Sequence, residues 1–140
     1  MQSITDKINC MKSAYKGKPL DQTKLIMTQR RLMLNNMPQI PDDYIKVLHE
    51  YNSLACDGCV IFGVNPREES DLDIITENVL ISPRNKTDNL ILGWNELEYL
   101  QWNKISSCYQ IVDKVDFEVL KTYHTCKDAL WDFLKLDDCY

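Results

Sequence analysis

Two cysteines separated by two residues form the sharpest local motif of the chain, Cys56-Asp-Gly-Cys59. A tetrahedral zinc site would need two further cysteine or histidine ligands at suitable spacing, and the sequence offers no second pair. A thioredoxin-like redox pair would follow a strand and begin a helix, where the helix dipole lowers the thiol pKa. Here the predicted order is helix, turn and strand. We therefore expect Cys56 and Cys59 to be packed thiols on either side of a turn.

The other side chains that could take part in chemistry form no recognisable site. His49 lies on a predicted helix and His124 precedes another, and neither accompanies a nucleophile motif such as G-x-S-x-G. The four glycines never cluster into a loop that could cradle a phosphate. We expect no catalytic residues, no cofactor and no bound metal, so the protein is interpreted as a non-enzyme.

Carboxylates concentrate in the polar connection between residues 65 and 88. Four of them are predicted to bind a basic partner: Glu68, Glu69, Asp71 and Asp73. A negative surface attracts cations over a long range, and binding residues commonly lie in long connections. The alternative is a solvated loop with no binding role. The formal net charge of −5 argues against direct nucleic-acid binding, because that requires basic residues to neutralise phosphates.

Aromatic residues recur in the second half of the chain at Trp94, Tyr99, Trp102 and Tyr109. They could form a stacking platform for bases or sugars, but such a platform normally has interleaved lysine and arginine residues. Cross-strand packing is the favoured interpretation. If the acidic segment does not bind, Trp94, Tyr99 and Trp102 are the next candidates for a partner surface.

Length and composition indicate one domain covering residues 1–140, because this length can close a single hydrophobic core. No segment has the roughly 18 consecutive apolar residues of a membrane helix. The N-terminus lacks the apolar run of a signal peptide, so we expect a cytoplasmic protein without membrane contact. The six cysteines are then expected to be reduced.

Apolar periodicity and capping residues predict the elements that position these side chains. Helices are expected over residues 4–15, 21–35 and 41–51, the second with Met27 and Met33 on its apolar face. Asp57-Gly58 should turn the chain from the third helix into a strand over residues 59–64. A short helix or strand is expected near 72–80, and strands over 90–94, 98–102 and 109–113 should form an antiparallel meander. Thr125 should cap a last helix.

Two stretches carry a resemblance to a known family. The sequence IPDDYIKVLHEYNSL (residues 40–54), followed by DGCVIFG (57–63), resembles the hallmark (L/I)-P-x-D-Y-x-x-F-L-x-x-x-N-G-L of the SUKH superfamily of Smi/Knr-like proteins. The chain departs from that pattern at Ser53, where glycine is usual. The later LILGWNELEYLQWN (90–103), YQIVD (109–113) and a final helix over 125–136 are similar to its YrhA-like branch.

The resemblance implies an α+β fold with a mostly antiparallel sheet flanked by N-terminal helices and a C-terminal helix. It also implies a bacterial immunity protein that binds and neutralises a cognate polymorphic toxin, often a nuclease, through a stoichiometric protein–protein interaction. A fold does not determine a function, and two alternatives stay open. One is a general interaction adaptor of the same fold, and the other is a thiol-dependent enzyme using Cys56 or Cys59. The oligomeric state is not predicted.

Overall fold

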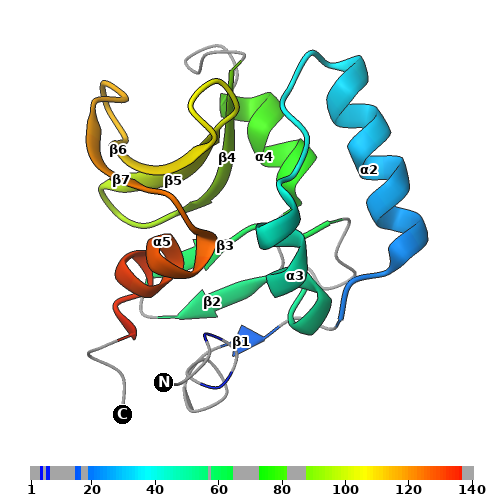
Figure 1. Ribbon diagram of the computed structural model, residues 1–140, viewed down its shortest axis with the longest axis horizontal. Helices are drawn as coiled ribbons and strands as arrows, with labels where there is room; N and C mark the ends of the chain where they lie inside the picture. Colours follow the sequence, from blue (N-terminus) through cyan, green and yellow to red (C-terminus); the bar gives the residue numbers. More distant parts are fainter. Residues whose placement is uncertain are drawn as a thin grey trace.

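The computed structural model describes residues 4, 6, 15–16, 19–56, 58–64, 73–81 and 88–136. These residues form an α+β fold in which seven strands make one antiparallel sheet, with helices packed around it (Figure 1). The expected fold class is therefore confirmed. In chain order the elements are β1 (Tyr15–Lys16), α2 (Gln22–Leu34), α3 (Asp42–Glu50), β2 (Leu54–Cys56), β3 (Cys59–Ile61), α4 (Ile74–Ile81), β4 (Asn89–Trp94), β5 (Glu98–Asn103), β6 (Cys108–Asp113), β7 (Val119–Tyr123) and α5 (Cys126–Phe133).

The spatial order of the strands is their sequence order, β1 to β7, and each strand pairs antiparallel with the next. Connections are short between β2 and β3 and between the strands from β4 to β7, whereas α2 and α3 lie between β1 and β2 and α4 lies between β3 and β4. The long strands β4, β5, β6 and β7 curve together, with α4 between β4 and α2, and α5 against β6 and β7 (Figure 1). The predicted meander is thus confirmed, and β7 extends it by a strand that the sequence patterns did not indicate.

Helix ends follow the local capping signals. The Asp21 carboxylate accepts hydrogen bonds from the backbone N–H groups of Thr23 and Lys24, at 2.9 and 3.2 Å, and so begins α2 where predicted. Thr125 accepts a hydrogen bond from the backbone N–H of Asp128 at 3.1 Å and begins α5 in the same way. The predicted helices beginning near residues 21, 41 and 125 are confirmed.

The buried face of α2 differs from the expected one. Leu25, Thr28 and Leu32 face the core, whereas Met27 and Met33 are 60% and 58% exposed. The assignment of these two methionines to the apolar face was wrong. Residues 25, 28 and 32 lie three and four positions apart on one side of the helix, and the methionines fall outside that stripe.

The end of the predicted first helix was also wrong. Tyr15, expected as its last residue, belongs to β1 and pairs with Ala55 of β2. A partner forty residues later in the chain, rather than local helical periodicity, decides its conformation. Most of the predicted helix over residues 4–15 lies outside the described residues, although Ile4 and Asp6 are helical.

The Cys-x-x-Cys motif spans a hairpin. Cys56 is the register partner of Cys59 across β2 and β3, and Gly58 lies in the connecting turn with φ of 80°, which glycine adopts without steric cost. The predicted order of helix, turn and strand was therefore wrong, because β2 lies between α3 and the turn. Leu54–Cys56 lacks β-branched residues and forms a strand through its pairing with β1 and β3.

A buried asparagine joins the end of α3 to the segment after β3. The Asn52 Oδ1 accepts a hydrogen bond from the Val64 N–H at 2.8 Å, and the Asn52 Nδ2 donates to the Val64 carbonyl at 2.9 Å. Gly63 allows this approach, since a Cβ there would lie 1.4 Å from the Asn52 carbonyl oxygen. The asparagine of the family-like motif thus has a structural task, and Ser53 beside it is buried.

Tyr44 anchors α3 to the sheet. Its side chain is fully buried, and its hydroxyl lies 2.5 Å from the Phe62 carbonyl oxygen and 3.0 Å from that of Leu92. Leu48, one turn later, shares the hydrophobic core with Phe62. This anchoring sets the position of the first turn of α3, which carries two aspartates, relative to the long strands.

Candidate functional site

Three of the four acidic residues predicted to bind a partner, Glu68, Glu69 and Asp71, lie outside the described residues. The fourth, Asp73, stabilises the start of α4: its Oδ2 accepts hydrogen bonds from the Thr76 backbone N–H and the Thr76 hydroxyl, both at 3.0 Å. The backbone of Asp73 also forms an isolated parallel β-bridge with Gly63. Asp73 therefore has a capping task whether or not it also contacts a partner.

The sheet separates Trp94, Tyr99 and Trp102, the aromatic residues that were the second candidates for a partner surface. Trp94 and Tyr99 are register partners of β4 and β5, whereas Trp102 pairs with Tyr109 of β6. Because successive strand residues alternate between faces, Tyr99 and Trp102, three positions apart, lie on opposite faces of the sheet. The three candidates thus do not form one surface.

The Trp94 and Tyr99 rings already contact a cation of the chain itself. The Lys114 ammonium lies 4.1 Å from the Trp94 ring centroid and 5.5 Å from that of Tyr99, and it donates a hydrogen bond to the Asn95 carbonyl at 2.7 Å. Phe117 stacks on the Tyr99 ring with centroids 5.6 Å apart. This arrangement stabilises the loop after β6, because aromatic faces attract cations.

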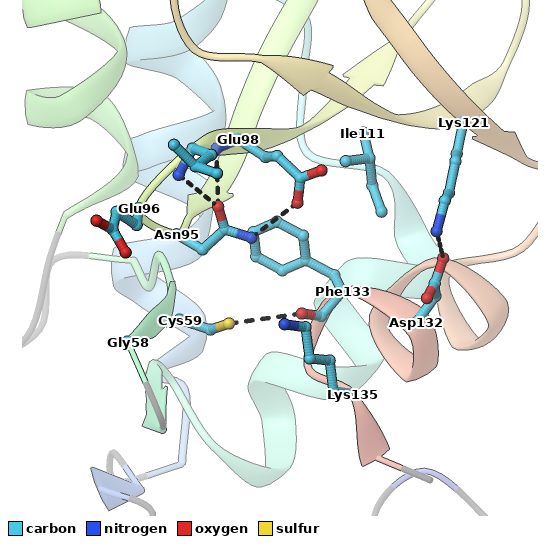
Figure 2. Close-up of a pocket in the computed structure, with 11 residues that line it drawn as sticks. Gly58, Cys59, Asn95, Glu96, Glu98, Ile111, Lys121, Asp132, Phe133 and Lys135 are labelled. Atoms are coloured by element: carbon cyan, nitrogen blue, oxygen red, sulfur yellow. Dashed lines mark hydrogen bonds and ion pairs between the residues drawn. The ribbon is translucent and has the colours of Figure 1, made fainter. Parts of the chain in front are cut away.

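A hollow of about 430 Å³ lies between the β2–β3 turn, the β4–β5 turn and the end of α5 (Figure 2). The polar groups on its walls bind one another. Asn95 donates to the Glu98 carboxylate at 2.9 Å and accepts the Glu98 backbone N–H at 2.7 Å. The Cys59 thiol donates to the Phe133 carbonyl at the end of α5, at 3.5 Å.

The far wall of the same hollow carries an ion pair. Lys121 of β7 lies 3.1 Å from the Asp132 carboxylate of α5, as Figure 2 shows, and the Tyr123 hydroxyl also donates to Asp132. These contacts hold the pKa of Asp132 below its usual value, with the Tyr123 hydrogen bond as the largest cause. Because the Lys121–Asp132 pair and the Asn95–Glu98 hydrogen bonds join its walls, this hollow is best explained as the joint between α5, β7 and the hairpins.

A second hollow, of about 340 Å³, combines acidic and aromatic side chains and is called the acid–aromatic pocket below. The start of α3 forms one wall, and β5, β6 and the residue before the Thr125 cap form the other. Its lining residues are Ile40, Pro41, Asp42, Asp43, Trp102, Tyr109 and His124. None of these described lining residues is a lysine or an arginine.

The aromatic wall of the pocket is well defined. The Trp102 and Tyr109 rings lie with centroids 4.9 Å apart and planes inclined by 55°. Tyr109 is buried and its hydroxyl is hydrogen-bonded to the Cys126 thiol. Cys108, hydrogen-bonded to the Ser106 carbonyl at 3.2 Å, has its sulfur 3.7 Å from the His124 Nδ1, so the imidazole is held at the rim.

The acidic wall gives the pocket a negative potential. Burial is the main cause that raises the pKa of Tyr109, and the Asp43 and Asp42 carboxylates raise it further. Burial also raises the pKa of Cys126 to about 12, again with a contribution from Asp43, so this thiol is neutral and unreactive at neutral pH. Both aspartates are exposed, and the contact of Asp43 with Lys46, 3.9 Å away, is a surface pair of little strength.

Asp42 and Asp43 lie in the first turn of α3, where acids favour the positive end of the helix dipole, and local sequence alone indicates no further role for them. The acid–aromatic pocket brings them to Trp102 and Tyr109, which are far apart from them in the chain. The sequence feature that could have indicated a binding role is the pair of adjacent aspartates, because a single acid in the first turn is enough to favour the helix dipole. Nothing in the sequence indicated which strand residues would face it.

Neither a protein-family profile nor a curated protein matches this sequence. Among the described residues, no group of three or more histidine, cysteine or acidic side chains is placed to hold a metal ion. No helix within the described ranges is both long and apolar enough to cross a bilayer.

Proposed function

We propose that this chain is a cytoplasmic immunity protein of the SUKH type, which binds a basic protein toxin stoichiometrically and thereby neutralises it. The acid–aromatic pocket is the observation that carries the proposal. Two exposed carboxylates beside the half-buried Trp102 ring suit a positively charged protein surface, because acids attract it and an accessible aromatic ring supplies contact area at an interface. A toxin that cleaves nucleic acid would have such a surface for holding phosphates.

Two further features support a basic partner. The net charge of −5 favours encounter with a positive protein, an effect that salt weakens by screening. The stretch that resembles the SUKH hallmark contains Asp42 and Asp43, so the residues behind the family expectation also line the pocket. The acidic residues Glu68, Glu69 and Asp71 add negative charge to the chain and would speed association with a basic partner.

The test uses the basic protein encoded beside the gene of this chain. Co-expression should restore growth of cells that produce the toxin, and the purified proteins should form a complex of one-to-one stoichiometry by light scattering. Absence of both a complex and protection would refute the immunity function. Binding without protection, together with similar binding to unrelated basic proteins, would instead favour the adaptor function.

The contribution of the acidic segment is measured by association kinetics at low and high salt. The variant Glu68→Gln, Glu69→Gln, Asp71→Asn leaves Asp73 in place, because Asp73 caps α4. We expect a slower on-rate and a flatter salt dependence than for the parent. A control with three exposed glutamates neutralised elsewhere, Glu50, Glu96 and Glu118, has the same net charge. Equal on-rates for the two variants would remove the segment from the binding site.

A further inference from the structure

We infer that the acid–aromatic pocket is a receptor for a single arginine side chain of the partner protein. The inference rests on the proposed function for the identity of the partner, but the pocket itself can be tested without any toxin. A guanidinium would lie against the Trp102 ring and face the Asp42 and Asp43 carboxylates.

The chain contains a built-in example of the same recognition. On the opposite face of the sheet, the Lys114 ammonium lies over Trp94 and Tyr99 and donates to a backbone carbonyl. The acid–aromatic pocket has a tryptophan–tyrosine pair as well, but here carboxylates replace the carbonyl as acceptors. A charged acceptor makes a stronger hydrogen bond to a cation than a neutral one does. The pocket therefore has the aromatic ring and the charged acceptors of a cation site, and the cation that fills it comes from another molecule.

Size and shape favour arginine over larger ligands. A volume of about 340 Å³ is at the small end of the range for ligand pockets and suits one side chain. The guanidinium is planar, so it can stack on an indole ring and direct its N–H groups at two acids at once. An ammonium is a compact, strongly hydrated charge that cannot do both. Arginine is also enriched among the residues that dominate binding energy at protein interfaces.

The negative potential at this site is directed at the aromatic pair. Both aspartates line the pocket together with Trp102 and Tyr109, and their charges contribute to the raised pKa of the Tyr109 hydroxyl, so their field reaches the wall opposite α3. His124 at the rim is held by its contact with Cys108 and closes one side. A cationic side chain entering the pocket would face the Asp42 and Asp43 carboxylates, the second of which has only the weak surface contact with Lys46, while stacking on Trp102.

The experiment titrates the isolated chain with N-acetyl-arginine amide and follows the indole N–H signals in ¹H–¹⁵N spectra. We expect the Trp102 signal to shift with saturation in the millimolar range, while the Trp94 signal stays unchanged because Lys114 already covers that ring. The neutral isostere N-acetyl-citrulline amide should produce no saturable shift. N-acetyl-lysine amide should bind several-fold more weakly than the arginine probe.

The variant Asp42→Asn, Asp43→Asn should weaken binding of the arginine probe by at least about tenfold, because both charged acceptors are lost. Glu50→Gln, Glu118→Gln has the same net charge, removes exposed acids elsewhere and should bind like the parent. Trp102→Phe keeps an aromatic ring and should weaken binding less than loss of the acids. Equal affinity for citrulline, equal affinity for lysine, or an unchanged Asp42/Asp43 variant would each overturn the inference.

The two proposals fail separately. If the arginine probe does not bind, the pocket assignment is wrong even where the chain protects cells from the toxin. If the probe binds but no toxin complex forms, the pocket stands as a cation site and the immunity function is refuted. In a complex with the toxin, Asp42→Asn, Asp43→Asn should raise the dissociation rate, and substitution of one toxin arginine should have no additional effect in that variant.

Discussion

Substitution of Asn52 by alanine should destabilise the protein severely, although the side chain is far from the acid–aromatic pocket. Asn52 is the sole partner found for the Val64 N–H and carbonyl among the described side-chain hydrogen bonds, at 2.8 and 2.9 Å. Val64 is fully buried, so water cannot replace the lost amide without a local rearrangement.

The magnitude follows from the two backbone groups left without a partner. Each buried unsatisfied group costs about 1–3 kcal/mol, so Asn52→Ala should lower the free energy of unfolding by about 2–6 kcal/mol. That is a large part of the roughly 5–15 kcal/mol that stabilises a typical domain. For a chain of this size the melting temperature should fall by at least about 6 °C.

The assay is equilibrium urea unfolding followed by circular dichroism, with thermal melting as a second measure. Asn35→Ala is the matched control: Asn35 donates to the Arg31 carbonyl at 2.8 Å, but this pair is exposed. Water replaces that hydrogen bond, so the control should stay within about 0.5 kcal/mol of the parent. If Asn52→Ala were as stable as Asn35→Ala, the account of Asn52 as the buried link between α3 and the end of β3 would be refuted.

Two further predictions concern the backbone and the acid stability. Gly63→Ala should lower the free energy of unfolding by about 3 kcal/mol or more, because its Cβ would overlap the Asn52 carbonyl oxygen. Gly58 has open space around it but a φ of 80°, so Gly58→Ala should lower it by only about 1–2 kcal/mol. Equal losses of stability in urea unfolding would contradict this difference. The pKa of Asp132 is lowered on folding, so its stabilising contribution is present at neutral pH and is lost as pH falls through the folded-state pKa. The stability deficit of Tyr123→Phe should therefore be largest near neutral pH and shrink in acid, and a deficit independent of pH would disprove the linkage.

Local chemistry in the sequence determined the helix starts and the central strands. Asp21 and Thr125 begin helices because a side-chain oxygen can satisfy a backbone N–H only three residues away or less, and that requirement is visible in the sequence. The strands over 90–113 were predictable because their apolar and aromatic residues recur between short turns. Tyr44 and Leu48 are four positions apart and both buried on α3, as the helical period of apolar residues requires.

Tertiary pairing decided the short and exposed strands. Tyr15 and Ala55 adopt extended conformations because they pair with each other, and neither segment has a strand pattern of its own. β7 was missed since it forms the edge of the sheet with mostly exposed residues, so no buried alternation marks it. Met27 and Met33 are exposed because the core contacts only one stripe of α2, and the sequence does not specify which stripe.

The acid–aromatic pocket depended wholly on the tertiary structure. Local sequence patterns predicted that a helix begins at Asp42 and Asp43 and that Trp102 and Tyr109 lie on neighbouring strands. Their approach requires the Tyr44 contacts that set α3 against the sheet, and the β5–β6 register that puts Trp102 opposite Tyr109. Periodicity reports which side of an element is buried, because burial repeats with each turn or residue pair. It carries no information on which distant element covers that side. A binding pocket forms between the two elements that meet there, so only the tertiary structure defines it.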